Sequence, residues 1–475
     1  MKPLVEELDW ISPHQVFHDL ASEAFALFLD SATAGPGLDT GRHGQWSFIA
    51  IEPFQTLVWR QRDAGKPFEI LKQMLATLPP VESDCRMPPF IGGAAGFFGY
   101  GLGRTLERLP PEEPPFAIDD QNLPDLALGF YDTVLAFDMA ERRAFIVSTG
   151  LPLHDPEKRR EHASTRAEAM RKRLSCLEHA ATPKEPGSPA ISANFTREAY
   201  ERAVARVIDY IHAGDIFQAN ISQRFETEIG PCDTPYALYL RLRKASPAPF
   251  ASFFNFGEGA LLSSSPERFL LCRDGEVETK PIKGTRKRGA TRAEDDALAA
   301  ELLASEKDRA ENVMIVDLLR NDISRVCEDS SVVVDKLCEL ESFANVHHLV
   351  STVRGKLRLG KSAADLLAAC FPGGSVTGAP KRRAMEIIAE LEPTTRGPYC
   401  GAIGYLGADG NMDSAIAIRT MTVKGRRVTF QAGGGIVADS DPASEYEETL
   451  AKARDMRAAA GTSDTKASLL EGESA

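Results

Sequence analysis

Short strand-like segments joined by tight turns recur along the whole chain, and this pattern most constrains the fold. LLSSSPERFLLC and EVETKPIKGT, for example, flank a turn at Arg273-Asp274-Gly275. Turns this short join antiparallel neighbours, whereas parallel strands need a long crossover that usually contains a helix. Such hairpins outnumber β-helix-β crossovers in this sequence. The pattern predicts an α+β protein with an antiparallel core flanked by helices, and not a doubly wound parallel sheet.

The composition is that of a folded, acidic protein. At 475 residues, with 43% hydrophobic and 26% charged residues, the chain is long enough for one large core or two ordinary domains. Its 55 Lys and Arg residues stand against 68 Asp and Glu residues. The resulting net charge of -13 disfavours general binding to nucleic acid or to an anionic membrane. An anionic ligand must therefore meet a local cationic patch.

No targeting segment or cysteine framework is expected. The start MKPLVEELDW carries acidic residues where a signal peptide needs an apolar core, and no apolar run approaches ~18 residues. The eight cysteines form no CxxC pair, and none lies in the GxCxG turn of a glutaminase nucleophile. We expect a cytoplasmic protein with mostly reduced core thiols, without a zinc cluster and without a glutaminase of its own.

One boundary divides the chain. A charged helix precedes ATPKEPGSPAISAN, whose Pro, Gly and Ser content is typical of a linker. Thr196 then has the position of an N-cap, and Gly214 ends the helix that follows it. We expect an N-terminal region at 1–185, a second region at 186–456 and a disordered tail at 457–475.

Lys283, within PIKGT, is a lysine where a small or apolar residue would pack more cheaply. If the hairpin loop has three residues, Cys272 pairs with Glu276, and Glu267 lies diagonal to Lys283 on the same face. A two-residue loop would reverse this parity. Burial and the cationic stretch 286–288 could lower the lysine pKa enough to make it a nucleophile. The alternative is a salt bridge to Glu267 at a solvated edge.

Acidic residues recur at helical spacing in two further segments. Asp308 and Glu311 are at i and i+3 on one predicted helix, and Glu445 and Glu448 repeat this spacing on another, with Lys452 on the same stripe. Two such pairs facing each other would repel by about 4 kcal/mol per close contact at an intermediate dielectric. Mg²⁺, which prefers oxygen ligands, is the natural cation to hold them together. Alternatively, both pairs are ordinary solvated helix charges.

FPGGSVTGAPKRRAMEIIAELE places a glycine-rich loop before a helix. Gly373 and Gly378 have the GxxxxG spacing, but the lysine follows only at Lys381, and the preceding segment has a helical pattern. The loop is therefore not a nucleotide-binding P-loop. It can still offer backbone N–H groups and a positive helix end to a carboxylate or phosphate. The alternative is that its glycines serve only a tight turn.

Three single residues carry weaker signals. Gly435 in QAGGGIV allows a close approach of the backbone to a ligand, or marks a bulge. Arg419 stands among small residues on the predicted strand DSAIAIRTM, where it could clamp a carboxylate or lie at an edge in water. His348 shares a strand face with two valines, where a core histidine is more common than a catalytic one.

Taken together, these segments resemble the chorismate-utilising enzymes. The resemblance is dense over 195–455, through GDIFQANISQRF, SSSPERF, PIKGT, DRAENVMIVDLLRND, GGSVTGAPK, GAIGYLG, IAIRT and QAGGGIVADSDPASEYEET. Within the family, anthranilate synthases carry PIAGT and aminodeoxychorismate synthases of this kind carry PIKGT, so the chain resembles the latter. The resemblance implies an antiparallel β-sandwich with helices outside, to which both halves of the chain contribute.

The resemblance also implies residue roles. In the family, the lysine attacks C2 of chorismate while the C4 hydroxyl leaves with magnesium and acid assistance, and ammonia then adds at C4 and expels the lysine. Carried over, Lys283 is the nucleophile and Glu267 the general acid/base. The metal-binding acids correspond to Asp308, Glu311, Glu445 and Glu448, and the substrate-contacting positions to His348, Tyr399, Arg419, Gly435 and Lys452.

Mg²⁺ is the implied cofactor, chorismate and ammonia are the implied substrates, and a separate glutamine amidotransferase subunit is the implied partner, in para-aminobenzoate and folate biosynthesis. The element that binds feedback tryptophan in anthranilate synthases is represented only by FALFLDSATAG, with Asp30-Ser31 in place of Glu-Ser. Tryptophan binding is therefore not carried over. Anthranilate synthase component I and isochorismate synthase remain alternatives, and a nucleotide-binding regulatory module is the alternative from another class.

Overall fold

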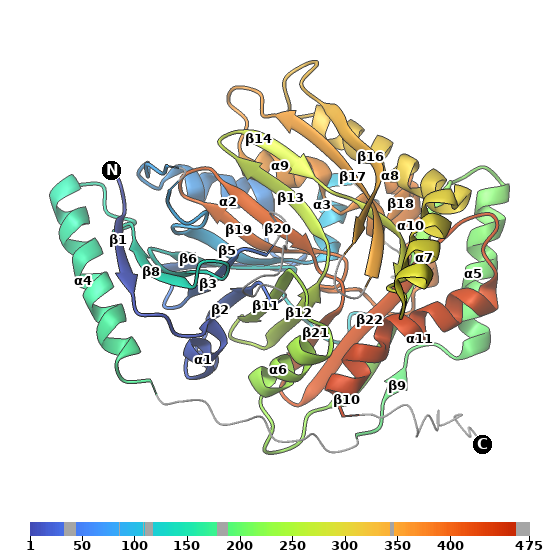
Figure 1. The fold of residues 1–475 in the computed structure, drawn as a ribbon, viewed down its shortest axis with the longest axis horizontal. Coiled ribbons are helices and arrows are strands. Elements are labelled where there is room, and N and C mark those ends of the chain that lie inside the picture. Colours follow the sequence, from blue (N-terminus) through green and yellow to red (C-terminus); the bar gives the residue numbers. More distant parts are fainter. Residues whose placement is uncertain are drawn as a thin grey trace.

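A computed structural model describes residues 1–32, 44–84, 86–107, 109, 117–177, 189–342 and 346–461. In this part of the chain, two antiparallel sheets of 12 and 10 strands form the centre of the molecule, and helices lie around them (Figure 1). The prediction of an α+β protein with an antiparallel core is confirmed.

The strands of each sheet come from distant parts of the chain. In sheet order, the larger sheet contains β1 (Leu4–Leu8), β8 (Arg143–Ser148), β7 (Thr133–Asp138), β3 (Trp46–Ala50), β2 (Leu27–Asp30), β11 (Phe250–Asn255), β12 (Ala260–Ser265), β21 (Thr420–Lys424), β22 (Arg427–Ile436), β10 (Gln218–Glu228) and β18 (Gly378–Ala379), with β9 (Ser192–Ala193) beside β10. The smaller sheet contains β15 (Ile282–Lys287), β17 (Val346–Lys356), β14 (Glu276–Thr279), β13 (Arg268–Arg273), β20 (Met412–Ile416), β19 (Ala402–Gly407), β5 (Gly93–Phe98), β6 (Leu126–Tyr131) and β4 (Gln55–Trp59), with β16 (Val333–Ser342) beside β17.

Helices lie around these sheets (Figure 1). In chain order they are α1 (Pro13–His18), α2 (Pro67–Ala76), α3 (Gly103–Glu107), α4 (Pro156–Leu174), α5 (Arg197–His212), α6 (Pro235–Ala245), α7 (Arg292–Ala304), α8 (Glu306–Ser324), α9 (Ala363–Cys370), α10 (Lys381–Leu391) and α11 (Pro442–Ala459), with 3₁₀ turns η1 (Tyr100–Leu102) and η2 (Gly374–Val376). The predicted cap of α5 is confirmed, since the Thr196 side chain accepts the Ala199 N–H. None of the described helices has both the length and the apolar character needed to cross a bilayer.

A continuous core lies between the two sheets. Phe254 of β11, in the larger sheet, packs edge-on against Phe97 of β5, in the smaller one, with ring centroids 6.3 Å apart. Both side chains are fully buried, and Leu27, Leu261 and Tyr405 join the same cluster. Burial of large apolar side chains is the main favourable contribution to a fold of this kind.

Strands from both sides of the predicted boundary near 185 pair within each sheet. β2 pairs with β11 in the larger sheet, and β5 pairs with β19 in the smaller one. Residues 178–188, on which the boundary itself falls, lie outside the described residues. The start of the predicted tail at 457 belongs instead to α11, which continues to Ala459, and residues 462–475 lie outside the described part.

The hairpin turn between β13 and β14 differs from the prediction. Arg273 pairs with Glu276 and Cys272 with Val277, so the loop has two residues and the predicted pairing of Cys272 with Glu276 is wrong. Asp274 and the following glycine both have positive φ angles, 53° and 81°. A type I′ turn requires this combination, which an Asp-Gly pair readily adopts.

Prolines interrupt both strands of the predicted hairpin. Pro266 and Glu267 separate β12 of the larger sheet from β13 of the smaller one, and Lys280-Pro281 separates β14 from β15. Proline has no N–H to donate to a ladder, so continuous pairing ends at each site. The face parity counted outward from the turn therefore does not extend to Glu267 or Lys283, and their directions are set by the tertiary structure.

Candidate active site

One cavity of about 810 Å³ brings the predicted site residues together. It lies where the chain passes between the sheets, and β15, β17, β22, α8 and α11 contribute to its walls. Its lining includes every residue that the sequence predicted for catalysis, substrate contact or metal binding: Lys283, Glu267, His348, Tyr399, Arg419, Gly435, Lys452, Asp308, Glu311, Glu445 and Glu448. Residues up to 185 apart in sequence (267–452) thus line one cavity.

Lys283 projects from β15 into this cavity, where its Nζ lies 3.5 Å from the carbonyl oxygen of Ser375. It forms no ion pair with a described carboxylate, so the alternative of a salt bridge to Glu267 is not found. Burial lowers the pKa of Lys283, the Glu311 carboxylate opposes this effect, and the Lys452 ammonium adds to it. The amine is therefore easier to deprotonate than an exposed lysine.

The neighbouring basic residues do not supply the repulsion that the sequence suggested. Arg286 pairs with Glu301 at 2.8 Å, and Arg288 pairs with Asp295 at 2.6 Å. These cations are thus compensated by acids of α7, and the like charge that acts on the lysine comes from α11.

Glu267 lies in the link between β12 and β13, and its carboxylate accepts hydrogen bonds from Ser375 Oγ at 2.9 Å and from the Ile282 N–H. Burial raises the pKa of Glu267 to about 7, against the opposing effects of the Ser375 bond and the Lys283 ammonium. A carboxyl with a pKa near neutrality can both give and take a proton. The bond to Ile282 holds it beside the strand that carries the lysine.

Two capped helices deliver the four acids. Ser305 caps α8 by accepting the Asp308 N–H, and the Asp441 side chain caps α11 by accepting the Ser444 N–H. The glycine run of β22 lies under the acids of α11, since a Cβ on Gly434 would be 2.7 Å from Glu445 Oε2 and 3.3 Å from Glu448 Oε1. The pairing of β22 with β10 is continuous through the glycines, so they serve close approach and not a bulge.

Cations of the chain itself hold two of these acids. Arg286 Nη2 lies 3.4 Å from Asp308 Oδ2, and Lys452 Nζ lies 2.6 Å from Glu448 Oε1. Burial also acts on Glu448, but the Lys452 ammonium outweighs it and leaves the pKa of Glu448 below its ordinary value. Burial raises the pKa of Glu311 and, separately, that of the first acid of α11, Glu445.

The four acids have the ligand chemistry that suits Mg²⁺, although their carboxylates do not surround a common centre. Within the described ranges, no three or more His, Cys, Asp or Glu side chains lie close enough together to hold a metal ion. Their carboxylate oxygens are nevertheless the ligands that Mg²⁺ prefers. Binding it would require Asp308 and Glu448 to exchange their present cationic partners for the ion.

Arg419 and His348 also line the cavity. Arg419 is not on a strand as predicted but in the link between β20 and β21, with φ at 52°, and its Nη1 donates to the Lys452 carbonyl oxygen at 2.6 Å. It lies in the cavity wall and not at a solvated edge. Burial lowers the pKa of His348 to about 4, so this ring is neutral at physiological pH, with Nδ1 2.8 Å from Thr285 Oγ1.

The sequence analysis missed Gln218 at the start of β10. This side chain is fully buried, and neither its amide nitrogen nor its oxygen has a hydrogen-bond partner in the described structure. A Cβ on Gly435 would collide with its Nε2 and would lie 3.5 Å from Lys283 Nζ. A buried amide without a partner is costly, so its place beside the lysine marks a candidate functional residue. A polar residue at an inward position of a buried strand was the available signal.

The glycine-rich loop contributes to the same cavity. Ser375 bonds Glu267 through its hydroxyl and faces Lys283 with its carbonyl oxygen. Lys381, the P-loop candidate, is buried elsewhere, with Nζ 2.7 Å from Asp322 Oδ2 and 2.8 Å from the Cys370 carbonyl oxygen. Its charge is therefore committed to the packing of α10 against α8.

The cavity holds an amine with a lowered pKa beside a carboxyl with a raised pKa, together with the four predicted acids and the basic side chains of Arg419 and Lys452. Such a combination is typical of an enzyme active site. The chain belongs to the chorismate binding enzymes, a family that matches residues 37–458. The resemblance seen in the sequence is thereby confirmed.

Relatives of two kinds are similar to this chain. Aminodeoxychorismate synthase component 1 of Klebsiella aerogenes is 42% identical over 470 residues, which are 95% of this chain and 98% of that protein. Anthranilate synthase component 1 of Thermus thermophilus is 41% identical over 460 residues, which are 94% of each chain. The crystal structure of anthranilate synthase component I from Streptococcus pneumoniae has a TM-score of 0.76 and 34% identity, with 88% of this chain and 93% of that chain covered. The expected family fold is confirmed.

Proposed function

We propose that this chain is component I of an aminodeoxychorismate synthase, which converts chorismate and ammonia to 4-amino-4-deoxychorismate. Relatives named for this activity and for anthranilate synthase have almost the same identity, so similarity alone does not choose between them. The observation that carries the proposal is the amine of Lys283 inside the acid-lined cavity, at the position where the anthranilate synthase motif has alanine.

The lowered pKa of Lys283 and the raised pKa of Glu267 support a covalent route. In this route, the neutral amine attacks C2 of chorismate, the ring double bonds shift, and the C4 hydroxyl leaves as water with a proton from Glu267. Ammonia then adds at C4, the double bonds shift back, and the bond between C2 and the lysine nitrogen breaks. Because the lysine occupies C2 in the intermediate, ammonia enters at C4 and not at C2.

The remaining cavity residues have supporting roles in this proposal. A Mg²⁺ ion bound by the four acids would neutralise their charge and that of a substrate carboxylate. Arg419 and Lys452 would hold the anionic substrate, and the neutral ring of His348 would offer it a hydrogen bond. Tyr399 and Gly435 would shape the wall against which the ring lies.

The proposal includes a partner and a place in the cell. Ammonia would come from a separate glutamine amidotransferase subunit, because the sequence has no glutaminase motif of its own. The product would lead to para-aminobenzoate and folate, and the protein would act in the cytoplasm.

Product analysis tests this function. The purified chain with chorismate, MgCl₂ and an ammonium salt should form aminodeoxychorismate, seen by chromatography with mass detection. Fluorescent anthranilate or isochorismate as the product would contradict the proposal and favour the corresponding alternative. Glutamine should support turnover only after an amidotransferase subunit is added, so glutamine-dependent turnover by the chain alone would contradict the proposed partner.

A further inference from the structure

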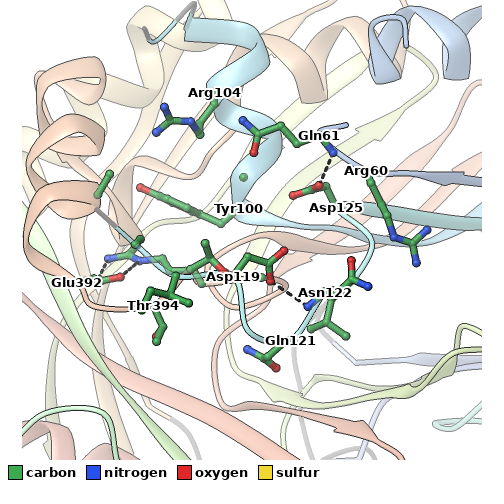
Figure 2. Close-up of a pocket in the computed structure, with 18 of the residues that line it drawn as sticks. Arg60, Gln61, Tyr100, Arg104, Asp119, Gln121, Asn122, Asp125, Glu392 and Thr394 are labelled. Atoms are coloured by element: carbon green, nitrogen blue, oxygen red, sulfur yellow. Dashed lines mark hydrogen bonds and ion pairs between the residues drawn. The ribbon is translucent and has the colours of Figure 1, made fainter. Parts of the chain in front are cut away.

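A second cavity, of about 670 Å³, lies apart from the candidate active site and shares none of its lining residues. Its walls come from the turn after β4, from η1, from the loop before β6, and from the end of α10 with the segment that follows (Figure 2). A volume of this size is typical of small-molecule sites, which run from about 300 to 1,000 Å³.

A carboxylate without a counter-ion lies in the wall of this cavity. Asp125 Oδ2 accepts the Gln61 N–H at 2.8 Å, and the side chain forms no ion pair within the described ranges. Burial raises the pKa of Asp125 to about 6. Asp125 is half-buried, and partial burial of a carboxylate that carries a single hydrogen bond is unfavourable unless a cation or a donor joins it. Figure 2 shows Asp125 on one side of the opening, with Asp119 below it.

Four arginines also line this cavity, namely Arg60, Arg62, Arg104 and Arg396, and two of them form ion pairs with acids of the chain. Arg396 lies 2.7 Å from Glu392 Oε1 and donates to the carbonyl oxygens of Asn220 at 2.6 Å and Val376 at 3.0 Å. Arg60 pairs with Glu258. The Asp119 carboxylate accepts the Asn122 N–H, and among the described residues neither Asp119 nor Asp125 forms an ion pair with a basic side chain.

The rest of the lining is apolar. The ring of Tyr100 forms one face, stacked under the Arg396 guanidinium at 4.6 Å, and Leu123, Met385 and Ile388 add aliphatic surface. These four side chains are buried by the fold and offer their remaining surface to the cavity. Such a wall favours an apolar body about the size of a phenyl ring.

We infer that this cavity binds a protonated primary amine with an apolar body, its ammonium group held by Asp125 and Asp119 and its apolar part packed against Tyr100, Met385 and Ile388. An ammonium group supplies three donors and the positive charge that Asp125 lacks. The inference does not depend on the proposed function, because it concerns a different cavity and is tested by binding alone.

The test is calorimetric titration of the full chain with three probes that share a phenyl ring. 2-Phenylethylamine carries only the ammonium group, phenylalanine carries both charges, and 3-phenylpropionate carries only the carboxylate. The amine should bind saturably and the carboxylate should not. Binding of phenylalanine comparable to that of the amine would support the site and extend its occupants to amino acids, whereas equal binding of 3-phenylpropionate and the amine would overturn the inference.

Matched variants locate the binding. Asp125→Asn keeps the size and the Gln61 contact but removes the charge, so it should weaken amine binding by about tenfold or more. Asp63→Asn removes a charge from the same turn outside the cavity lining, and this variant should bind the amine like the unaltered protein.

If Asp125→Asn does not fold, Asp119→Asn at an exposed position of the same cavity serves instead, with an expected loss of amine affinity of about threefold or more. Unchanged affinity in these cavity variants, or no saturable binding of the amine, would refute the inference.

Discussion

At the scale of single residues, burial displaces two pKa values toward each other. An exposed lysine has a pKa near ~10.4 and an exposed glutamate one near ~4.3. In this cavity, burial lowers the pKa of Lys283 and raises that of Glu267 to about 7. Both groups lose hydration, which each charged form needs more than its neutral form does. Proton transfer between these two groups therefore costs less than it does between the exposed side chains.

Replacing Lys283 by alanine should abolish any covalent adduct with chorismate. The proposed bond at C2 needs the amine, and Lys283 lies in the cavity wall with a lowered pKa. Intact-mass analysis after rapid quenching measures the adduct. Lys287→Ala, which removes an exposed lysine from the same strand, is the matched control and should still form it. An adduct that persists without Lys283 would assign the nucleophile to another residue.

Glu267→Gln should stabilise the ligand-free protein above neutral pH. Because the folded pKa of Glu267 is about 7 and the unfolded one lies near the ordinary 4.5, its stabilising contribution is complete below ~4.5 and is lost as pH rises to about 7. The loss amounts to roughly 3 kcal/mol, and glutamine, which stays neutral, avoids it. Urea unfolding at about pH 5 and about pH 8 should show the variant gaining on the unaltered protein at the higher pH.

Glu161→Gln on α4 is the control for this comparison, since its side chain is exposed and should show no such pH dependence. If Glu267→Gln changes the free energy of unfolding by the same amount at both pH values, the raised pKa of Glu267 is contradicted.

At the scale of elements, the glycines of β22 and the acids of α11 form one unit. The strand has no side chain at Gly434, so the helix can place two carboxylates directly over its backbone. The helix cap at Asp441 fixes where this acidic stripe begins. Two turns after Glu445, the Lys452 Nζ donates a hydrogen bond to the Gly433 carbonyl oxygen at 2.9 Å, which ties the helix to the strand. Neither element would present the acids to the cavity without the other.

Gly434→Ala should therefore weaken the response to Mg²⁺. The added methyl group would press on the carboxylates of Glu445 and Glu448, and a displaced ligand typically costs tenfold or more in metal affinity, so the half-saturating Mg²⁺ concentration should rise by about tenfold. Turnover measured over a MgCl₂ series gives this concentration. Gly230→Ala is the control, because its nearest neighbour would be 3.9 Å away. An unchanged Mg²⁺ response would place the metal away from these acids.

At the scale of the whole molecule, the two regions on either side of 185 complete each other's sheets. Without β2 and β5, the strands β11 and β19 would each lose an antiparallel neighbour in the middle of a sheet. The core between the sheets would also lose the contact between the rings of Phe97 and Phe254. Unpaired central strands and exposed aromatic rings favour aggregation over folding.

A fragment comprising residues 186–461 should accordingly fail to fold alone. We expect an aggregated or non-cooperative product, seen as the absence of a sigmoidal urea transition and of near-ultraviolet circular dichroism. Mixing it with separately produced residues 1–185 is the control and should restore some structure if the missing strands are the cause. A monomeric fragment with a cooperative transition would show that the regions are independent folding units.

The comparison of sequence with structure is clearest at the hairpin that carries Lys283. Turn chemistry indicated a hairpin correctly, but it did not give the loop length, and the parity argument built on a three-residue loop was wrong. Glu267 and Lys283 still share the cavity, because prolines end the strands and the link after β12 crosses to the other sheet. Arg419 was likewise placed on a strand by its pattern, although it lies in a link between sheets.

The sequence by itself determined the antiparallel α+β class, the helix caps, and the set of residues whose chemistry points to one site, because hydrogen-bonding patterns, turn preferences and side-chain chemistry are local properties. The tertiary structure alone decided that four acids on two helices line one cavity, that Gln218 lies buried beside the lysine, and that a second cavity exists at Asp125. Burial and proximity between segments far apart in the chain set these features and their pKa values, and neither quantity is defined until the sheets have assembled.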